Sequence, residues 1–410
     1  MLDMGDIPVR VENRTNEDPI VIVGGPVVSA NPEPYVDFVD AFVIGEGDIV
    51  IHEIVESITS SSSRNEALVA LSGIEGVYVP SLPQDSVVRL IMPDLDRLFH
   101  PIAQVIADVD DNSTLAPVFG ASLLVEVSRG CGHSCKFCLV GHICRPRRVR
   151  SVPKLKEIIQ EGLELTPVRK ISLIASSLGD LDNLEELASW IIEQDLQLST
   201  PSLRADRVTP KLLEILKMGG QRTLTIAPET GSSELRKKMG KGLSDDAIFS
   251  AVEAAKEMGF KSIKTYFIIG LPGESDEDIL DLGNMVSKIA KQTGLRTIAS
   301  VNPFIPKAHT KWEREPQPSL EDLRRRIKLV EKSLHNVPRT VLEALDPRSA
   351  RIQAALSIGD RSLGKIIRIA AEQGGFGGWR RAEKETGIRF FEIASAQDRL
   401  VDELPWHFIK

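Results

Sequence analysis

The stretch that most constrains this chain is VEVSRGCGHSCKFCLVGHICRPRRVR, residues 125–150. Cys131, Cys135 and Cys138 occur in it at the spacing CxxxCxxC, directly after an apolar, strand-like run over Leu123 to Val127. Three thiolates on a short loop can hold one face of a cuboidal iron–sulfur cluster, whereas a fourth cysteine would normally close the last iron. The spacing therefore predicts a cluster with one iron free to bind a small molecule.

The same cysteines could instead serve a disulfide framework or a zinc site. Four cysteines in 410 residues, without a basic-then-apolar leader, do not indicate a secreted disulfide framework. Zinc needs a fourth ligand at a compatible spacing, and His133, His142 or Cys144 could supply it. We expect Cys144 to be a small buried thiol or a neighbour of the cluster, because a closed cluster could not bind a further molecule.

The motif resembles that of the radical S-adenosylmethionine (SAM) superfamily in its cysteine spacing, its preceding strand and the aromatic Phe137 before the last cysteine. The resemblance implies a [4Fe-4S] cluster whose metal ligands and catalytic residues are the three cysteines, with SAM on the fourth iron. It also implies an electron donor as a partner, since one electron from the cluster cleaves SAM to methionine and a 5′-deoxyadenosyl radical. Phe137 would then be a wall for adenine, or simply a packing residue.

Composition is that of a globular chain of two or three domains. Of its 410 residues, 42% are apolar and 26% are charged, and no apolar run approaches the ~20 residues that span a bilayer. We therefore expect a cytoplasmic protein without a membrane partner. The net charge of −8 argues against a protein that mainly binds nucleic acid.

The first 60 residues contain two strands that each end at glycines. Pro19 to Val23 leads into Gly24-Gly25-Pro26, and Ala41 to Ile44 leads into Gly45-Glu46-Gly47 and then a helix over Ile49 to Thr59. This order is typical of a Rossmann-like sheet, in which ligands lie at the carboxyl ends of parallel strands. The glycines would let the backbone approach a large ligand, although ordinary turns would also explain them. Residues 66–120 are expected to form short strands and turns.

The segments IVIVGGPVVSANPEP and DAFVIGEGD resemble the second half of the domain that binds cobalamin in cobalamin-dependent radical SAM enzymes. The resemblance implies cobalamin contacts at the two glycine turns just named, 24–26 and 45–47. There is no DxHxxG motif, so no histidine from that motif can ligate cobalt. The chain begins where the domain of that family is half built, so we expect it to be either naturally short or trimmed.

Charge is distributed unevenly along the chain. Residues 1–120 hold no lysine, five arginines and twenty acidic residues, a balance of −15, so the remainder carries about +7. This break predicts a domain boundary near residue 120, and the two parts could meet through complementary charge. A basic run follows the cysteine loop and could be a solvated face, a nucleic-acid patch, or a contact for an acidic partner, the cobalamin phosphate or the acidic N-terminal part. Its members are Arg145, Arg147, Arg148 and Arg150.

Between residues 123 and 301, apolar strands alternate with amphipathic helices, which predicts a parallel sheet with crossover helices. Six such units resemble the partial (β/α)6 barrel of the radical SAM superfamily, and chemistry in such barrels gathers at the carboxyl ends of the strands. The expected strands are 123–128, 170–175, 196–203, 222–227, 262–269 and 297–301. The expected helices include 154–165, 184–193, 210–218 and 244–258.

By the same resemblance, candidate SAM contacts follow three of these strands. Ser176 stands where the superfamily contacts the SAM amino group, and Ser202 with Arg204 resembles the SxR element that holds the carboxylate and ribose. Glu229 lies in an APETGS element and would contact SAM or substrate. An arginine suits a carboxylate because its planar fork donates paired hydrogen bonds. The alternatives are local: Ser202 could cap a turn, Arg204 could pair with Asp206, and Glu229 could pair with a lysine of the following helix.

The sequence therefore predicts an α/β fold in three parts. Residues 1–120 form a short Rossmann-like cobalamin-binding domain, 121–310 the partial (β/α)6 barrel, and 311–410 a small helical module that caps the barrel mouth. Helices are expected at 320–334, 349–357, 360–373 and 379–386.

The resemblance implies methyl transfer from methylcobalamin to an unactivated sp3 carbon. The short front domain and the overall size further resemble the archaeal glutamine C-methyltransferases of methyl-coenzyme M reductase, so the implied partner is a peptide segment of its alpha subunit. Three alternatives stay open. They are a cobalamin-independent radical SAM enzyme doing hydrogen abstraction or rearrangement, a tRNA methylthiotransferase, which would need three more cysteines, and a zinc- or cluster-binding adaptor without catalysis.

Overall fold

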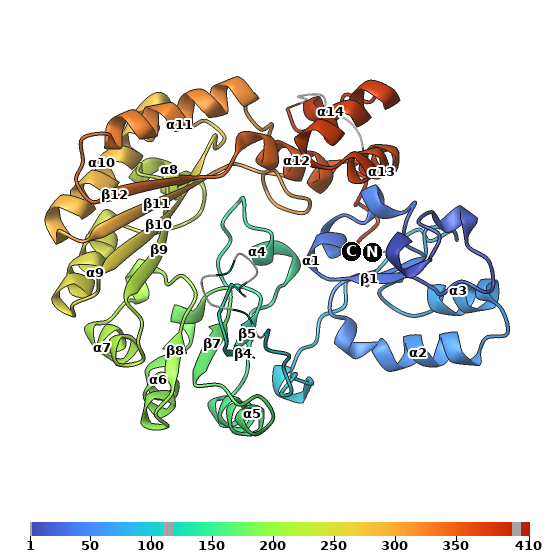
Figure 1. Cartoon of the computed structure of the whole chain (residues 1–410), viewed down its shortest axis with the longest axis horizontal. Helices are drawn as coiled ribbons and strands as arrows, with labels where there is room; N and C mark the ends of the chain where they lie inside the picture. Colours follow the sequence, from blue (N-terminus) through green and yellow to red (C-terminus); the bar gives the residue numbers. More distant parts are fainter. Residues whose placement is uncertain (1, 108, 110–112, 114–115, 117, 396–402) are drawn as a thin grey trace.

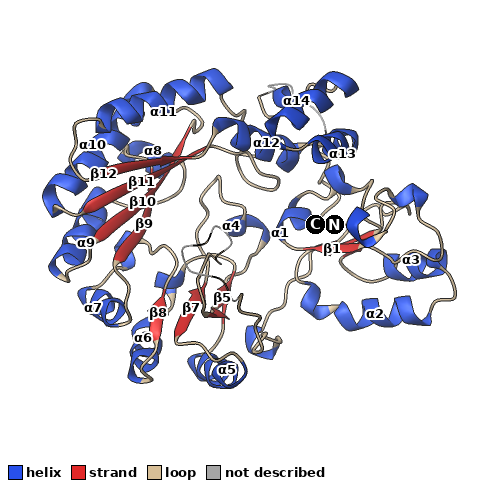
Figure 2. Ribbon diagram, in the orientation of Figure 1, coloured by secondary structure: helices blue, strands red, loops and turns tan. Residues whose placement is uncertain are grey.

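Parallel strands build the larger part of the molecule (Figures 1 and 2). The computed structural model describes residues 2–107, 109, 113, 116, 118–395 and 403–410. In this larger part the described strands include two parallel sheets, joined by a bridge between Leu203 and Ile226. The first sheet has the order β4 (Leu123–Glu126), β7 (Lys170–Ile174), β8 (Gln197–Ser199), and the second β9 (Thr223–Glu229), β10 (Ser262–Ile269), β11 (Arg296–Pro303), β12 (Thr340–Ala344).

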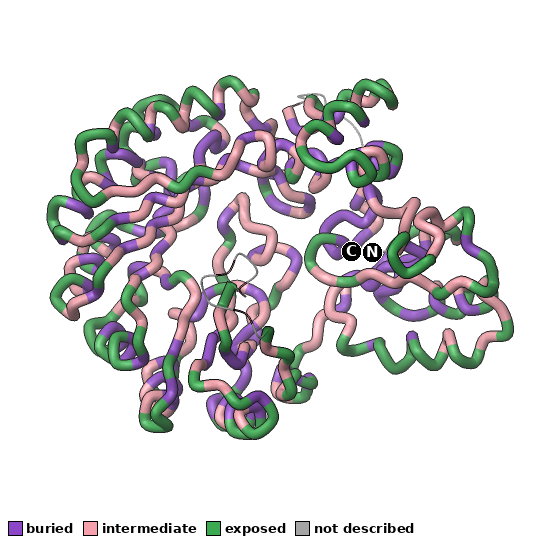
Figure 3. The backbone as a smooth tube through the Cα atoms, viewed as in Figure 1, coloured by how far each residue is buried: buried purple, intermediate pink, exposed green. Residues whose placement is uncertain are grey.

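Helices cover the outer side of this curved sheet, and Figure 3 shows exposed residues along their outward faces. They are α5 (Val152–Leu165), α6 (Leu184–Glu193), α7 (Pro210–Met218), α8 (Ser233–Lys238), α9 (Asp245–Glu257), α10 (Asp276–Thr293) and α11 (Leu320–Leu334). Ser151, Thr209 and Ser275 cap α5, α7 and α10 by accepting a backbone N–H of the first turn. The alternation of strands and helices confirms the predicted α/β class. None of the described helices is long and apolar enough to cross a membrane.

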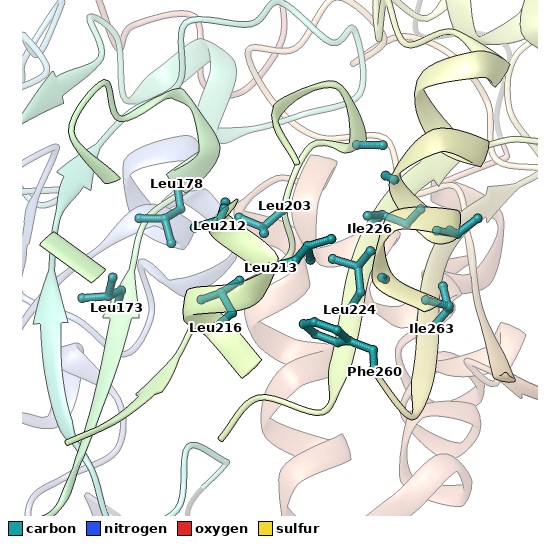
Figure 4. Close-up of a cluster of buried hydrophobic side chains, with 14 of the residues drawn as sticks. Leu173, Leu178, Leu203, Leu212, Leu213, Leu216, Leu224, Ile226, Phe260 and Ile263 are labelled. Carbon is teal, nitrogen blue, oxygen red and sulfur yellow. The ribbon is translucent and has the colours of Figure 1, made fainter. Parts of the chain in front are cut away.

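Apolar side chains between the sheet and the helices form the main core. Figure 4 shows Leu203, Leu213 of α7 and Ile226 of β9 gathered in one cluster. Leu213 and Ile226 are fully buried and Leu203 is 2% exposed. Each such side chain contributes about 1.5–3 kcal/mol relative to an exposed one, so this cluster fixes where the strand ends lie.

The sheet continues into the region that we expected to be helical. β12 pairs in parallel with β11 from Thr340 to Ala344. None of its five residues is buried, so it lacks the apolar alternation that marks a strand, and its pairing at the sheet edge creates it. The helices that follow are α12 (Pro347–Ile358), α13 (Gly364–Gln373), α14 (Gly375–Thr386) and α15 (Phe390–Ile393), and the first three fall on the predicted segments.

A smaller sheet in the front part of the chain lies beside the barrel (Figure 1). β1 (Ile22–Gly24) pairs in parallel with β2 (Ala41–Val43), as the strand–glycine pattern predicted, and β3 (Val77–Tyr78) pairs with β2 antiparallel. The helices here are α1 (Pro26–Ala30), α2 (Ile51–Ser60) and α3 (Arg64–Ser72). The prediction of strands and turns from residue 66 was wrong at α3, because only two of its nine residues are buried and its apolar pattern is weak.

The C-terminal segment, residues 403–410, connects this front sheet to the barrel side of the molecule. Three backbone hydrogen bonds of 2.9 Å join it to residues 87–89. Trp406 is fully buried, and its indole Nε1–H donates to the Glu313 carboxylate over 2.9 Å. The segment therefore holds the two parts of the molecule against each other.

A partly buried histidine at the same junction should make stability depend on pH. Nε2 of His309 lies 3.0 Å from the carbonyl oxygen of Ala30, which can only accept, so this nitrogen carries the proton. Burial, with a smaller effect of Arg89, lowers the pKa of His309 from 6.5 to about 4. The unfolded chain thus binds the proton first, and the free energy of unfolding should fall by up to ~3 kcal/mol as pH drops from 6.5 to 4.

Urea denaturation at a series of pH values checks this expectation. His309→Asn should lose most of the dependence between pH 6.5 and 4, since asparagine does not titrate and tolerates the positive φ of 63° at this position. The same pH dependence in the wild type and the variant would show that His309 does not cause it.

Candidate active site

The cysteine loop is fastened to neighbouring elements at its centre. It lies between β5 (Ser128–Arg129) and β6 (Arg148–Val149), which pair antiparallel, and contains the short helix α4 (Val140–Ile143). The N–H of Lys136 donates to the carbonyl of Met239 over 2.9 Å, and the N–H of Trp312 donates to the carbonyl of Lys136 over 3.2 Å. The loop is thus tied to the segment that follows α8 and to the one that follows β11.

The three predicted cluster ligands face a common region. Cys135 is buried and the other two are partly buried, and all three thiols are free. Burial raises the pKa of Cys135 to about 11, and the nearby thiols of Cys138 and Cys131 add to the rise. The described residues include no group of three His, Cys, Asp or Glu side chains close enough to hold a single ion. In a [4Fe-4S] cluster each thiolate binds a different iron, so three free thiols on one loop suit one face of such a cluster.

Gly130, just before the first cysteine, has a conformation that other residues rarely adopt. Its φ is +77°, and a Cβ at this position would lie 2.0 Å from the carbonyl oxygen of Cys144. Gly130→Ala should therefore distort the loop, lower the iron content after reconstitution, and destabilise the protein by at least about 1–3 kcal/mol. Iron analysis and chemical denaturation check this.

Gly132→Ala is the matched control for that variant. No atom lies within 4 Å of its Cβ position, so this loop glycine should accept a methyl group and keep its iron. An equal loss of iron in both variants would mean that the loop tolerates no added methyl group anywhere, and that the contact with Cys144 is not the cause.

A cavity of about 320 Å³ opens at the carboxyl ends of β9, β10 and β11. Three of the predicted SAM contacts, Phe137, Ser202 and Glu229, line it together. Tyr266 and Lys307 also line it. The structure thus brings residues from the cysteine loop and from three strand ends to one cavity, as expected for parallel strands. Their contact with SAM stays a prediction.

Glu229 holds a strained position at the end of β9. Its φ is +70°, and its carboxylate lies 2.8 Å from Nζ of Lys241. Both side chains are nearly buried, 12% and 11% exposed. We expected a lysine of the following helix as partner, but Lys241 lies just beyond that helix. No motif marks it, because only the path of the loop after α8 brings it back to the strand end.

Arg204 does not line this cavity. Its guanidinium pairs with the Asp206 carboxylate through Nε at 3.0 Å and Nη2 at 2.8 Å, the local alternative that its position allowed. Its Nη1–H also donates to the carbonyl of Lys241 over 3.3 Å. Arg204 therefore lies beside the residue that contacts Glu229, and a direct role toward SAM stays a prediction.

A second cavity, of about 890 Å³, lies between the front sheet and the barrel. Both glycine turns, residues 24–26 and 45–47, line it, and Cys144 and Gly130 line it from the cysteine loop. Ser176, expected near SAM with Phe137 and Ser202, lines this larger cavity instead. The end of β7 faces the front sheet, whereas the ends of β9 to β11 face the smaller cavity, and the contact of Ser176 with SAM stays a prediction.

The two glycine turns serve different purposes. Gly25 has a φ of +102°, and no atom lies within 4 Å of its Cβ position, so its backbone is open to the cavity. Gly45 has a φ of +97°, and a Cβ there would lie 2.2 Å from the carbonyl oxygen of Leu90. The expectation that glycines here admit a ligand thus suits Gly25, whereas Gly45 is needed for close packing against the chain at Leu90.

Two arginines of the basic run turn toward the acidic front part. Arg148 is 7% exposed, pairs with Glu46 at 2.8 Å and donates to the carbonyl of Met92 over 2.7 Å. Arg150 is 1% exposed and donates to the carbonyl of Leu98 over 3.2 Å. The interpretation that this run meets the acidic N-terminal part therefore holds for these two residues.

Known proteins with similar sequences support the assignment of the cysteine loop to a radical SAM site. The family described as "Radical SAM superfamily" matches residues 125–286, and "Radical SAM proteins, N-terminal" matches residues 1–80. An uncharacterised protein of Methanocaldococcus jannaschii is 35% identical over 356 residues, which cover 86% of this chain and 74% of that protein. An uncharacterised methyltransferase of Pyrococcus horikoshii is 25% identical over 300 residues, and the match covers 72% of this chain and 63% of that protein, less than two thirds of its length.

Solved structures show the same fold. The radical SAM methyltransferase TsrM from Kitasatospora setae, determined with cobalamin and a [4Fe-4S] cluster, matches with a TM-score of 0.53 at 14% identity, over 72% of this chain and 58% of that chain. Proteins named as methyltransferases and methylthiotransferases both occur among the sequence relatives. The radical SAM domain implies a [4Fe-4S] cluster and SAM as cofactors, and the three thiols beside the strand ends fit that cluster. This chain is an enzyme and belongs to the radical SAM superfamily.

Proposed function

We propose that this protein is a cobalamin-dependent methyltransferase that adds a methyl group to an unactivated sp3 carbon, that of a glutamine in methyl-coenzyme M reductase. The observation that carries the cofactor assignment is the large cavity, because glycine turns of a Rossmann-like sheet and the cysteine loop line it from opposite sides. Its volume of about 890 Å³ is at the upper end of the ~300–1,000 Å³ range of small-molecule sites. The peptide substrate rests only on the sequence resemblance to the glutamine C-methyltransferases of methyl-coenzyme M reductase.

The relatives support the reaction class. One is named a methyltransferase, and the solved methyltransferase TsrM contains cobalamin together with a [4Fe-4S] cluster in a similar fold. A methylthiotransferase with a second cluster would need three cysteines beyond the loop, and the chain has only Cys144. This count favours methyl transfer over methylthiolation.

The residues of the small cavity and those of the large cavity would have different roles in the proposed reaction. When bound, the cluster with SAM supplies one-electron chemistry at a C–H bond, and cobalamin supplies the methyl group. Cys131, Cys135 and Cys138 would hold the cluster. Phe137 and the apolar lining of the small cavity exclude water from the reacting centre.

Two side chains of the small cavity can orient an amino-acid group. The Glu229 carboxylate can accept from an ammonium group while Lys241 holds it in place. The Lys307 side chain makes no hydrogen bond or ion pair within the described residues. Burial lowers its pKa, so its ammonium group is placed to meet a carboxylate. Together they are complementary to the ammonium and carboxylate groups of the methionine part of SAM.

Anaerobic reconstitution tests the cofactor assignment. The full chain is supplied with iron, sulfide and hydroxocobalamin and then desalted. About one cobalt and four irons per chain are expected. Four irons without cobalt would overturn the cobalamin assignment and favour cobalamin-independent radical chemistry.

A second experiment tests the reaction and the substrate. Cobalt-loaded protein is given SAM, a reductant, and peptides from the methyl-coenzyme M reductase alpha subunit, and the products are read by mass spectrometry. The proposal expects 5′-deoxyadenosine and a methylated glutamine, and it expects no methylation when that glutamine is replaced by asparagine. Formation of 5′-deoxyadenosine without any peptide methylation would reject the substrate while leaving the enzyme class in place.

A further inference from the structure

Arg89 lies on the wall of the large cavity, on a segment with a fixed backbone. The N–H of Leu90 donates to the carbonyl of Ile44 over 2.9 Å, and the N–H of Arg89 donates to the carbonyl of Lys410 over 2.9 Å. The segment thus runs between the end of β2 and the C-terminal segment. The side chain of Arg89 is therefore attached to a backbone held in place by hydrogen bonds, close to the turn at Gly45.

The charged side chains that line this cavity differ in how they are neutralised. Arg129 forms ion pairs with Asp48 at 2.7 Å and Glu126 at 2.8 Å. Glu46 pairs with Arg148 outside the cavity lining at 2.8 Å. Arg89 lines the same cavity but forms no ion pair with any described residue.

The guanidinium of Arg89 is also short of hydrogen-bond acceptors. Its Nη2–H donates to the carbonyl of Ser29 over 3.3 Å, and its Nε is buried without a partner. Burial lowers its pKa, with a small opposing effect of the Cys144 thiol. The nearby His309 is neutral at pH 7, and its Nε2–H already donates to the carbonyl of Ala30. A half-buried arginine in this setting is stabilised by an anion, and the part of the chain that the structure describes supplies none.

Cobalamin carries one such anion. The side chains around its corrin ring are neutral amides, whereas the nucleotide loop contains a phosphodiester. A guanidinium fork matches two phosphate oxygens with charge-assisted hydrogen bonds. We propose that Arg89 binds the phosphodiester of the cobalamin nucleotide loop, and so distinguishes complete cobalamin from corrinoids without that loop. This inference rests on the proposed function.

Binding of two corrinoids to the full, cluster-reconstituted chain tests it in a phosphate-free buffer. Equilibrium dialysis with hydroxocobalamin and with aquacobinamide, which lacks the nucleotide loop, gives a dissociation constant for each. The wild type should bind hydroxocobalamin at least about 10-fold more tightly. Arg89→Gln should lose about that factor for hydroxocobalamin and keep its affinity for aquacobinamide.

Two further variants keep the result interpretable. Arg97→Gln removes one positive charge from an exposed site of the front part and should leave both affinities unchanged. Arg89→Lys keeps the charge but loses the fork, and its preference for hydroxocobalamin should lie between those of the wild type and Arg89→Gln. It also serves as the test variant if Arg89→Gln does not fold.

The outcomes separate this inference from the proposed function. No binding of either corrinoid by the wild type would reject the proposed cofactor. Tight binding of both, with equal affinities or with equal losses in the Arg89 variants, would reject the role of Arg89 and leave the cofactor in place.

Discussion

Cys135→Ala is expected to abolish both cluster retention and the cleavage of SAM. Cys135 is the most buried of the three loop cysteines, and the residue after it is bonded to Met239 and Trp312, so no other described thiol can take its position. A cluster held by only two thiolates should be lost on desalting, and iron should fall from about four per chain to well below one. Iron analysis and the formation of 5′-deoxyadenosine from SAM under reducing conditions measure the two effects.

The fourth cysteine provides the control for this prediction. Cys144→Ala removes a partly buried thiol from the wall of the large cavity and leaves the three proposed ligands intact. This variant should retain its iron and its SAM cleavage. If Cys144→Ala lost the cluster as completely as Cys135→Ala, all four cysteines would be ligands and the open-iron assignment would be wrong.

Trp406→Ala is expected to cause the largest loss of stability. The indole is fully buried, and truncating such a ring typically costs about 3–5 kcal/mol. The change would also remove a hydrogen bond to the Glu313 carboxylate, which accepts from the backbone N–H of His309 over 2.7 Å as well. The free energy of unfolding should fall, as measured by urea denaturation. The front sheet should dock less tightly, as measured by faster limited proteolysis between residues 80 and 120.

Trp190 is the matched control, because it is half-buried on α6 and its ring lies under Lys156. Trp190→Ala should cost roughly 1–2 kcal/mol, in line with its smaller buried area, and should leave proteolysis of the front part unchanged. Equal losses in the two variants would show that Trp406 contributes only packing and does not couple the two parts.

The barrel could be predicted largely because its signals are local. β10 and α6 have the bounds that apolar alternation and helical spacing predicted. Glu229 and Ser202 were found near one cavity because parallel strands bring their carboxyl ends to a common edge. The cysteine loop was recognisable because cluster binding demands a fixed ligand spacing.

The features that were missed depend on tertiary contacts. β12 exists through its pairing with β11, and Lys241 reaches Glu229 through the course of a loop. Ser176 follows a strand as predicted, but the position of the front sheet decides which cavity it faces. Arg89 lies in no recognisable motif. Its lack of a hydrogen-bond partner at Nε follows from its surroundings in space rather than from its neighbours in the chain.

The pairing of residues 403–410 with residues 87–89 has a consequence for how the protein is made. The ribosome releases the front sheet first, and at ~5–20 residues per second the C-terminal segment follows it by roughly 15–60 s. Until then the segment that carries Arg89 lacks its backbone partner, and the wall of the large cavity is incomplete. We therefore expect the cofactor to bind in that cavity only after the C-terminal segment has been translated. By then the front part of the chain has already left the ribosome's exit tunnel.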